Sequence, residues 1–131
     1  MTMHVLAACA AAALAFGAGL APASAETTTE TVLQTPLKGM PDSEANVVVF
    51  DVDPGWQTDE HHHPGHLFVY VLAGTLRVDV EGQEPQEYGP GEAFYEMPGI
   101  SMVATNIAAD ERAKFVVFQF GDAGEPIMVA D

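Results

Sequence analysis

Short extended segments separated by turns constrain the fold of this chain more than any other feature of its sequence. Residues 75–81 alternate strictly, with apolar Leu76, Val78 and Val80 between polar neighbours, which is the pattern of a strand that buries one face. Glycine, proline and aspartate separate most of the extended segments, and no stretch shows the helical period. This arrangement predicts an all-β barrel or sandwich. The further segments expected are 47–52, 67–72, 93–96, 101–105, 114–120 and 127–129.

The 131 residues suffice for one domain, and the N-terminal run differs from the rest. Residues 1–25 are apolar and alanine-rich and end in Ala23-Ser24-Ala25, which is typical of a secretory signal and its cleavage site. We therefore expect a signal peptide over 1–25, a leader with a short edge segment near Val32 over 26–45, and the barrel over 46–131. Such a chain is periplasmic or secreted, with no membrane attachment once the signal is removed.

Cys9 is the single cysteine, so its fate decides which metal ligands the mature chain offers. It lies in Leu6-Ala7-Ala8-Cys9, which resembles a lipoprotein cleavage box, and lipidation there is the competing interpretation of the N-terminal run. Cleavage after Ala25 removes the cysteine instead. A mature chain without a thiolate holds metal through nitrogen, oxygen or thioether atoms.

The chain is strongly acidic, with 19 acidic and 4 basic residues and a formal net charge of −15. Such a surface repels phosphate backbones and anionic lipids, which argues against nucleic acid and membranes as partners. It raises the local concentration of cations instead. The sequence names no substrate, and the expected partner is a small molecule of unknown identity.

A histidine cluster lies near the middle of the chain, where four of the five histidines fall between residues 61 and 66. His61 and His63 are two residues apart, so an extended chain places their side chains on one face and that of His62 on the other. Two imidazoles on one face are a pair of ligands for a transition metal. His66 follows the next turn, and three roles are open to it: a fourth ligand, a base behind the ligands, or a solvated loop residue.

Two motifs in this region resemble those of the cupins. The first, Gly55-x5-His61-x-His63-x3-Leu67-x6-Gly74, resembles the cupin pattern G-x5-H-x-H-x3-E-x6-G. The second, Gly91-x5-Met97-x-Gly99-x2-Met102-x3-Asn106, resembles the pattern G-x5-P-x-G-x2-H-x3-N. The resemblance covers residues 55–106. It implies a single double-stranded β-helix, a jelly-roll-like barrel, which agrees with the predicted strands.

The resemblance also implies a metal site and shows where this chain departs from it. In the usual cupin site, three histidines and one glutamate hold the metal. His61 and His63 stand at two of those positions, whereas Leu67 replaces the glutamate and Met102 replaces the third histidine. Asn106 is expected to close the turn after its strand rather than to take part in chemistry.

Two residues are candidates to complete the ligand set. Met102 carries a thioether, a soft ligand, and a His/His/Met set favours copper over Mn, Fe, Zn or Ni. The same side chain is also a common core filler. Glu96 belongs to Tyr95-Glu96-x-Pro98-Gly99, which looks like a run of many small single-domain cupins, and its carboxylate either stands in for the missing glutamate or faces solvent. The candidate ligands of one transition-metal ion are thus His61, His63, Met102, His66 and Glu96.

Three functions are compatible with these residues. The first is an exported metal enzyme, similar to an oxidoreductase or dioxygenase, and the second is an exported metal-binding protein without catalysis. The third is a degenerate, metal-free cupin whose apolar pocket, lined by Leu67, Phe94 and Met102, makes it a ligand-binding or structural dimer.

Assembly is a further expectation from the resemblance, because small cupins are similar to one another in pairing as homodimers. Phe115, Val117 and Phe120 are expected to form an outward apolar patch, together with one face of residues 68–72.

Overall fold

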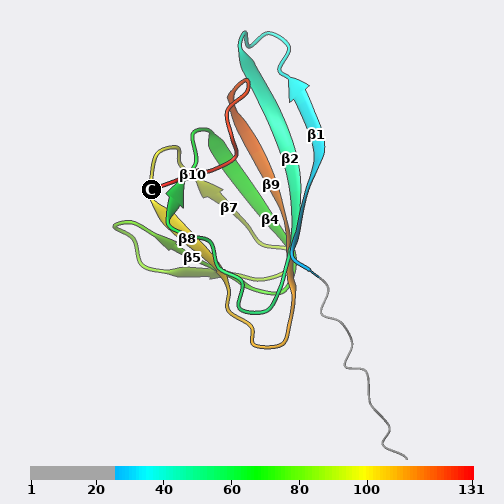
Figure 1. Ribbon diagram of the computed structural model, residues 1–131. Coiled ribbons are helices and arrows are strands. Elements are labelled where there is room, and N and C mark those ends of the chain that lie inside the picture. The colour runs from blue at the N-terminus through cyan, green and yellow to red at the C-terminus, as the bar shows by residue number, and fades with distance from the viewer. Residues whose placement is uncertain (1–25) are drawn as a thin grey trace, which may run out of the picture.

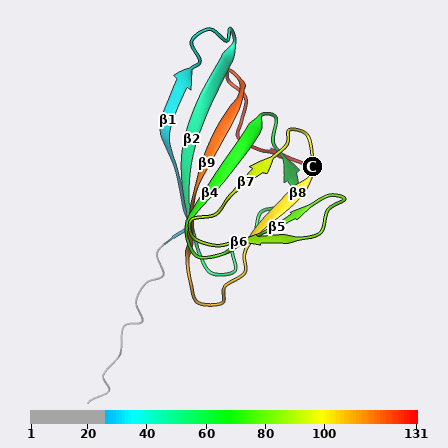
Figure 2. The same cartoon turned by 180° about the vertical axis from the view of Figure 1, so that it is seen from behind.

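The computed structural model describes residues 26–131 (Figures 1 and 2), so the expected signal segment at 1–25 lies outside the described residues. This part of the chain contains ten strands and no helix, which confirms the all-β prediction. Within residues 26–131 there is accordingly no helix with the length and hydropathy of a membrane span.

The strands form two five-stranded antiparallel sheets. The first sheet has the order β1-β2-β9-β4-β7 and the second has the order β10-β3-β8-β5-β6. Figure 1 shows β1 and β2 rising beyond the second sheet. The strands are β1 Thr28–Pro36, β2 Ser43–Val52, β3 His61–His62, β4 His66–Ala73, β5 Leu76–Val80, β6 Gln86–Tyr88, β7 Ala93–Glu96, β8 Met102–Asn106, β9 Ala113–Asp122 and β10 Val129–Ala130.

Strand β9 is the centre of the first sheet. It pairs with β2 along its whole length and with β4 on its other edge. Strand β4 pairs in turn with β7, where Leu67 lies directly opposite Glu96. In the second sheet the two-residue strand β3 pairs with both β8 and β10, and His61 lies opposite Met102. The pairing register therefore places Met102 beside His61 and Glu96 beside Leu67.

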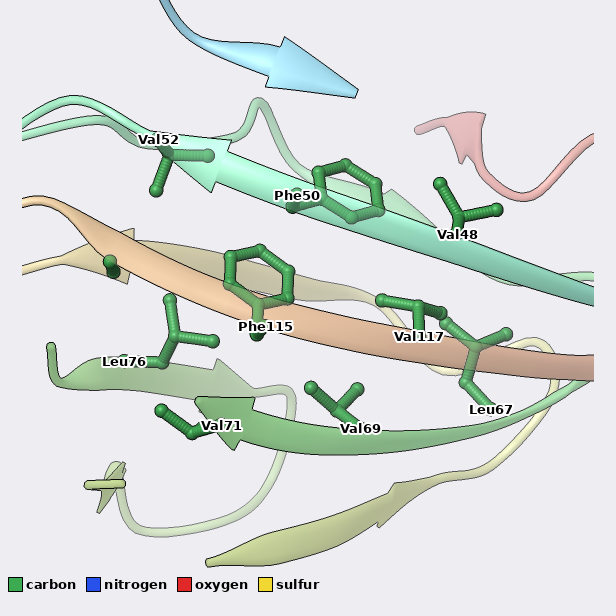
Figure 3. Close-up of a cluster of buried hydrophobic side chains, with 10 residues drawn as sticks. Val48, Phe50, Val52, Leu67, Val69, Val71, Leu76, Phe115 and Val117 are labelled. Carbon is green, nitrogen blue, oxygen red and sulfur yellow. The ribbon is translucent and has the colours of Figure 1, made fainter. Parts of the chain in front are cut away.

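Alternate side chains of β4 and β9 point between the sheets and form the core. Leu67, Val69 and Val71 are all buried, and the residues between them on β4 are exposed. Phe115 of β9 stacks on Phe50 of β2, with ring centroids 5.0 Å apart (Figure 3). Burial of one side chain of this size stabilises a fold by about 1.5–3 kcal/mol. The stability of the barrel therefore comes largely from this apolar layer.

The leader expected at 26–45 differs from what the structure shows. In place of a short segment near Val32, a nine-residue strand runs over Thr28–Pro36 and pairs with β2, with a register shift between Thr31 and Leu33. Most of its side chains are exposed, so it carries no alternation for hydrophobic patterning to detect. Its β-branched threonines nevertheless favour an extended chain, and β2 offers a full edge for pairing.

The outer face of the first sheet also differs from the expected dimer patch. Phe115 and Val117 are buried in the core, at 5% and 4% exposure, so the prediction that they face outward is wrong. The cause is strand parity, because both share the inward face of β9 with Ala113. Phe120 is exposed, as predicted, and packs edge-on against Phe68 of β4, with ring centroids 5.9 Å apart.

Candidate metal-binding site

A pocket between the two sheets holds most of the candidate ligands. His61, His63, Glu96 and Met102 all line it, and the rest of the lining is almost entirely apolar, with Thr58 as its hydroxyl side chain. The pocket contains neither lysine nor arginine. Its walls therefore keep the polar groups in an environment where unpaired charge is costly.

His61 and His63 point into the pocket as a pair. Each is 4% exposed, and their Nε2 atoms are 3.2 Å apart. The imidazole planes are nearly perpendicular, with ring centroids 4.8 Å apart. His62 lies between them, half-buried on the other face of β3, where its Nδ1 is 2.5 Å from an Asp131 carboxylate oxygen. The expected two-residue alternation therefore holds through the histidine cluster.

The protonation of the two rings follows from their outer partners. Nδ1 of His61 is 2.8 Å from the backbone oxygen of Asp59, and Nδ1 of His63 is 2.6 Å from the backbone oxygen of Ile127. A carbonyl oxygen accepts hydrogen bonds and never donates, so both Nδ1 atoms carry the proton. In neutral imidazoles this leaves two Nε2 lone pairs facing each other. Such a pair is satisfied by a cation between them, either a proton or a metal ion.

Glu96 brings a carboxylate next to His63. Its Oε2 is 3.1 Å from Nε2 of His63, and the side chain is 8% exposed. The register explains this position, because Glu96 on β7 lies opposite Leu67 on β4. A carboxylate thus lies on the neighbouring strand, directly opposite the position at which the cupin motif has its glutamate.

Met102 is also buried beside the histidines, at 4% exposure. It lies directly opposite His61 in the β3–β8 pair, so the two side chains share a face of the sheet. Directly opposed residues have Cβ atoms about 4.5–5.5 Å apart. Met102 is therefore the cross-strand neighbour of His61 and lines the same pocket.

His66 is placed away from this group, which removes it as a fourth ligand. It is exposed at the start of β4, with Nδ1 2.6 Å from the Tyr95 hydroxyl and its ring stacked on that of Tyr95. The physical reason is that β4 turns Leu67 inward, so its neighbour His66 must face outward. In the described part of the chain, no group of three or more His, Cys, Asp or Glu side chains is arranged to hold a metal ion. A site on His61 and His63 therefore needs a ligand of another kind.

Two contributors to the site escaped prediction from the sequence. Ile127 acts through its backbone oxygen, for which a sequence carries no side-chain signal. Gln119 is 3% exposed on the apolar face of β9 and donates from Nε2 to the backbone oxygen of Pro126 at 3.0 Å. The sequence signal for Gln119 is its position: it is a polar residue on the same inward face of the strand as Phe115 and Val117.

The two arginines lie outside the pocket and are engaged with acidic partners on the surface. Arg77 bonds Asp79 at 2.9 Å, which raises the pKa of Arg77 and lowers that of Asp79. Arg112 bonds Asp51 at 2.8 Å and also pairs with Asp53. No cationic clamp for an anionic substrate therefore lines the site among the described residues.

Comparisons with known proteins agree with this architecture. A sequence model described as a cupin domain matches residues 48–118. Comparison with curated protein sequences finds no match. Among solved structures, the DMSP lyase DddQ from Ruegeria pomeroyi is similar, with 22% identity and a TM-score of 0.64 over 80% of this chain. The present chain spans 51% of that lyase, about half its length.

Two further structures share the fold. One is an RmlC-like cupin family protein with a double-stranded β-helix fold from Methanocaldococcus jannaschii, with 19% identity and a TM-score of 0.61 over 76% of this chain and 84% of that one. The other is the polyketide cyclase RemF from Streptomyces resistomycificus, with 24% identity and a TM-score of 0.58 over 77% and 73%. At these identities the likeness establishes the fold and leaves the chemistry to the residues.

The predicted double-stranded β-helix is confirmed by this combination of two antiparallel sheets and cupin neighbours. The family match spans 71 of the 131 residues, from 48 to 118. The chain belongs to the cupin family.

Proposed function

We propose that this cupin is an exported protein that binds one transition-metal ion through His61 and His63, with Met102 as the third ligand and Glu96 beside them. The supporting observation is the buried pair of Nε2 atoms, 3.2 Å apart, with both Nδ1 protons directed to backbone oxygens. Two nitrogens that bind one ion, each about 2 Å from it, lie about 3 Å apart. The donor pair therefore fits a metal ion.

The ligand types favour copper over Mn, Fe, Zn or Ni. A thioether is a soft donor, and the His/His/Met combination suits copper better than the harder ions. The carboxylate of Glu96 contacts His63 and is the alternative third donor, which would favour a harder ion. The identity of the third ligand therefore decides metal preference.

A bound ion would supply a Lewis-acid or redox centre in a dry pocket. The lining of the pocket is largely apolar, and the Glu96 carboxylate lies 3.1 Å from Nε2 of His63. Because no basic side chain lines the pocket, a substrate would be small and without a strong negative charge. An oxidoreductase- or dioxygenase-like activity is one use of such a site, and metal binding without catalysis is the other.

Competitive titration with Cu(I) and Zn(II) tests the metal site. We expect the parent chain to bind one ion and His61→Ala to lose all detectable binding, because a single imidazole and a thioether do not retain the ion. His66→Ala is the matched control, since His66 faces outward, and should bind as the parent does. Equal binding by the parent and His61→Ala would refute the proposal.

The apolar lining also supports a second function, binding of a small apolar ligand without metal. In that case binding of an apolar fluorescent probe should persist in excess chelator and in His61→Ala. Metal-dependent probe binding would exclude this alternative in favour of the metal site.

A further inference from the structure

The C-terminal strap, residues 126–131, crosses from the end of β9 to the second sheet. Figure 1 shows this red segment leaving the first sheet after β9 and running to the C-terminus, and it includes β10. Ile127 and Met128 line the pocket together with His61 and His63. The strap therefore forms part of the wall of the candidate site.

His63 depends on the strap for its orientation. Strand β3 ends at His62, so His63 lies just beyond the paired residues of β3. Its backbone oxygen accepts from Gly99 at 2.9 Å. Its ring has the Ile127 oxygen 2.6 Å from Nδ1 and the Glu96 carboxylate 3.1 Å from Nε2. His61 differs, because its Nδ1 partner is the nearby Asp59. One ligand is thus oriented locally and the other by the far end of the chain.

The strap is held at both ends. At its start, the buried Gln119 donates to the Pro126 oxygen at 3.0 Å. At its end, β10 pairs with β3, the Asp131 amide donates to the Glu60 oxygen at 3.1 Å, and the Asp131 carboxylate bonds His62. These contacts set the Ile127 carbonyl between two anchors.

A close backbone contact reinforces the arrangement next to His63. A Cβ at Gly65 would lie 2.7 Å from the backbone oxygen of Phe120, and one at Gly121 would lie 3.1 Å from Cα of Gly65. The turn after His63 therefore packs directly on the segment that leads into the strap. His63 is held between two parts of the same C-terminal region.

We propose that residues 126–131, anchored by Gln119, are the positioning element of the site: the Ile127 carbonyl holds the His63 ring so that its Nε2 lone pair faces His61, and the strap closes the pocket. The effect on metal affinity rests on the proposed function, whereas the effect on the ring does not. Loss of a group that orients a metal-binding histidine typically costs 10–100-fold in affinity. Gln119 acts through the strap and does not touch the ion.

The test compares two deletions of the metal-free protein. Deletion of 126–131 removes the Ile127 carbonyl, whereas deletion of 129–131 removes β10 and Asp131 but keeps Ile127. Two-bond ¹⁵N–¹H spectra of the histidine rings report which nitrogen carries the proton. We expect His63 to keep its Nδ1 proton in the parent, to exchange partly between the nitrogens in the shorter deletion, which removes one anchor of the strap, and to exchange fully in the longer one. The affinity for the ion should fall about 10–100-fold in the longer deletion.

A point substitution covers the case in which the longer deletion fails to fold. Gln119→Met removes the donor to Pro126 at similar volume, and should shift the His63 signal and weaken metal binding in the same direction. The matched control is Gln34→Met, which acts on the same polar network through Glu44 without touching the strap. An unchanged His63 signal in Gln119→Met, or equal changes in both glutamine variants, would overturn the inference. A shift in a chain that binds no metal would support positioning while refuting the proposed function.

Discussion

At the scale of single residues, the candidate site depends on which side chain replaces each usual ligand. The glutamate missing at Leu67 is compensated in space by Glu96, its cross-strand partner on β7. Met102 stands opposite His61 in the position of the third imidazole. Asn106 keeps the structural role predicted for it: fully buried, it donates to the Asp53 and Glu111 backbone oxygens at 3.0 and 2.8 Å. The pocket thus brings a carboxylate and a thioether to the side chains of His61 and His63.

Substitution of Met102 separates the two possible third ligands. Met102→Leu keeps the volume, so we expect less than about 1.5 kcal/mol loss of unfolding free energy, together with a clear loss of Cu(I) affinity. Met102→His should build a three-imidazole site and shift preference toward Zn(II), Mn(II) or Fe(II). Competitive titration measures both effects. If Met102→Leu binds copper as tightly as the parent, the sulfur is core filling and the copper assignment fails, even if His61 and His63 hold some other ion.

At the scale of strands, the buried face can be predicted from the sequence where apolar and polar side chains alternate. Alternation correctly predicts the shared face of His61 and His63, because both are buried while His62 between them faces the other way. Strand β1 was underestimated because it lacks such a face, and Phe115 was assigned outward because 114–120 is apolar on both sides. The strap at 126–131 was beyond prediction, since it acts through backbone atoms. Periodicity therefore identifies buried faces and misses elements held by hydrogen bonds.

Glu44 of β2 accepts hydrogen bonds from β1, from β2 itself and from the loop after β9. The stability of this contact between the three segments should therefore depend on the ionisation of Glu44. Hydrogen bonds from Gln34, then the Gly124 amide, then Asn46 hold the pKa of Glu44 below its usual value of 4.5. A lowered pKa contributes stability that is fully present above the unfolded value and is lost as pH falls through the folded one. We expect Glu44→Gln to be less stable than the parent at pH 7, and this difference to shrink below about pH 4.5. Urea unfolding of both proteins across this range measures it, and a difference independent of pH would contradict the account.

At the scale of the whole molecule, the distribution of charge leaves one face suited to self-association. The net charge of −15 repels a second copy over most of the surface. The outer face of β4 and β7 instead exposes Phe68, Tyr70, Leu72 and Tyr95, each more than 40% exposed. Phe68 stacks on Tyr95, with ring centroids 5.0 Å apart. Exposed aromatic patches of this kind mark interaction sites.

We predict that this face forms a homodimer. Phe68→Glu places a carboxylate at its centre and should give a monomer, because two buried like charges would oppose each other. Val32→Glu adds the same charge on the exposed strand β1 and should leave the dimer intact. Light scattering at micromolar concentration distinguishes these outcomes. A monomeric parent would refute the prediction.

The order of strands in the sheets carries a consequence for folding kinetics. Neighbours such as β2 and β9, or β3 and β10, are far apart in the chain, so most of the contacts that close the barrel are non-local. Domains dominated by such contacts fold in milliseconds to seconds rather than microseconds. The carbonyl proposed to orient His63 belongs to Ile127, which follows β9 in the chain. The pocket therefore gains this partner only after β9 is in place and the segment behind it has docked on the second sheet. The proposed ion is expected to bind after that late docking step.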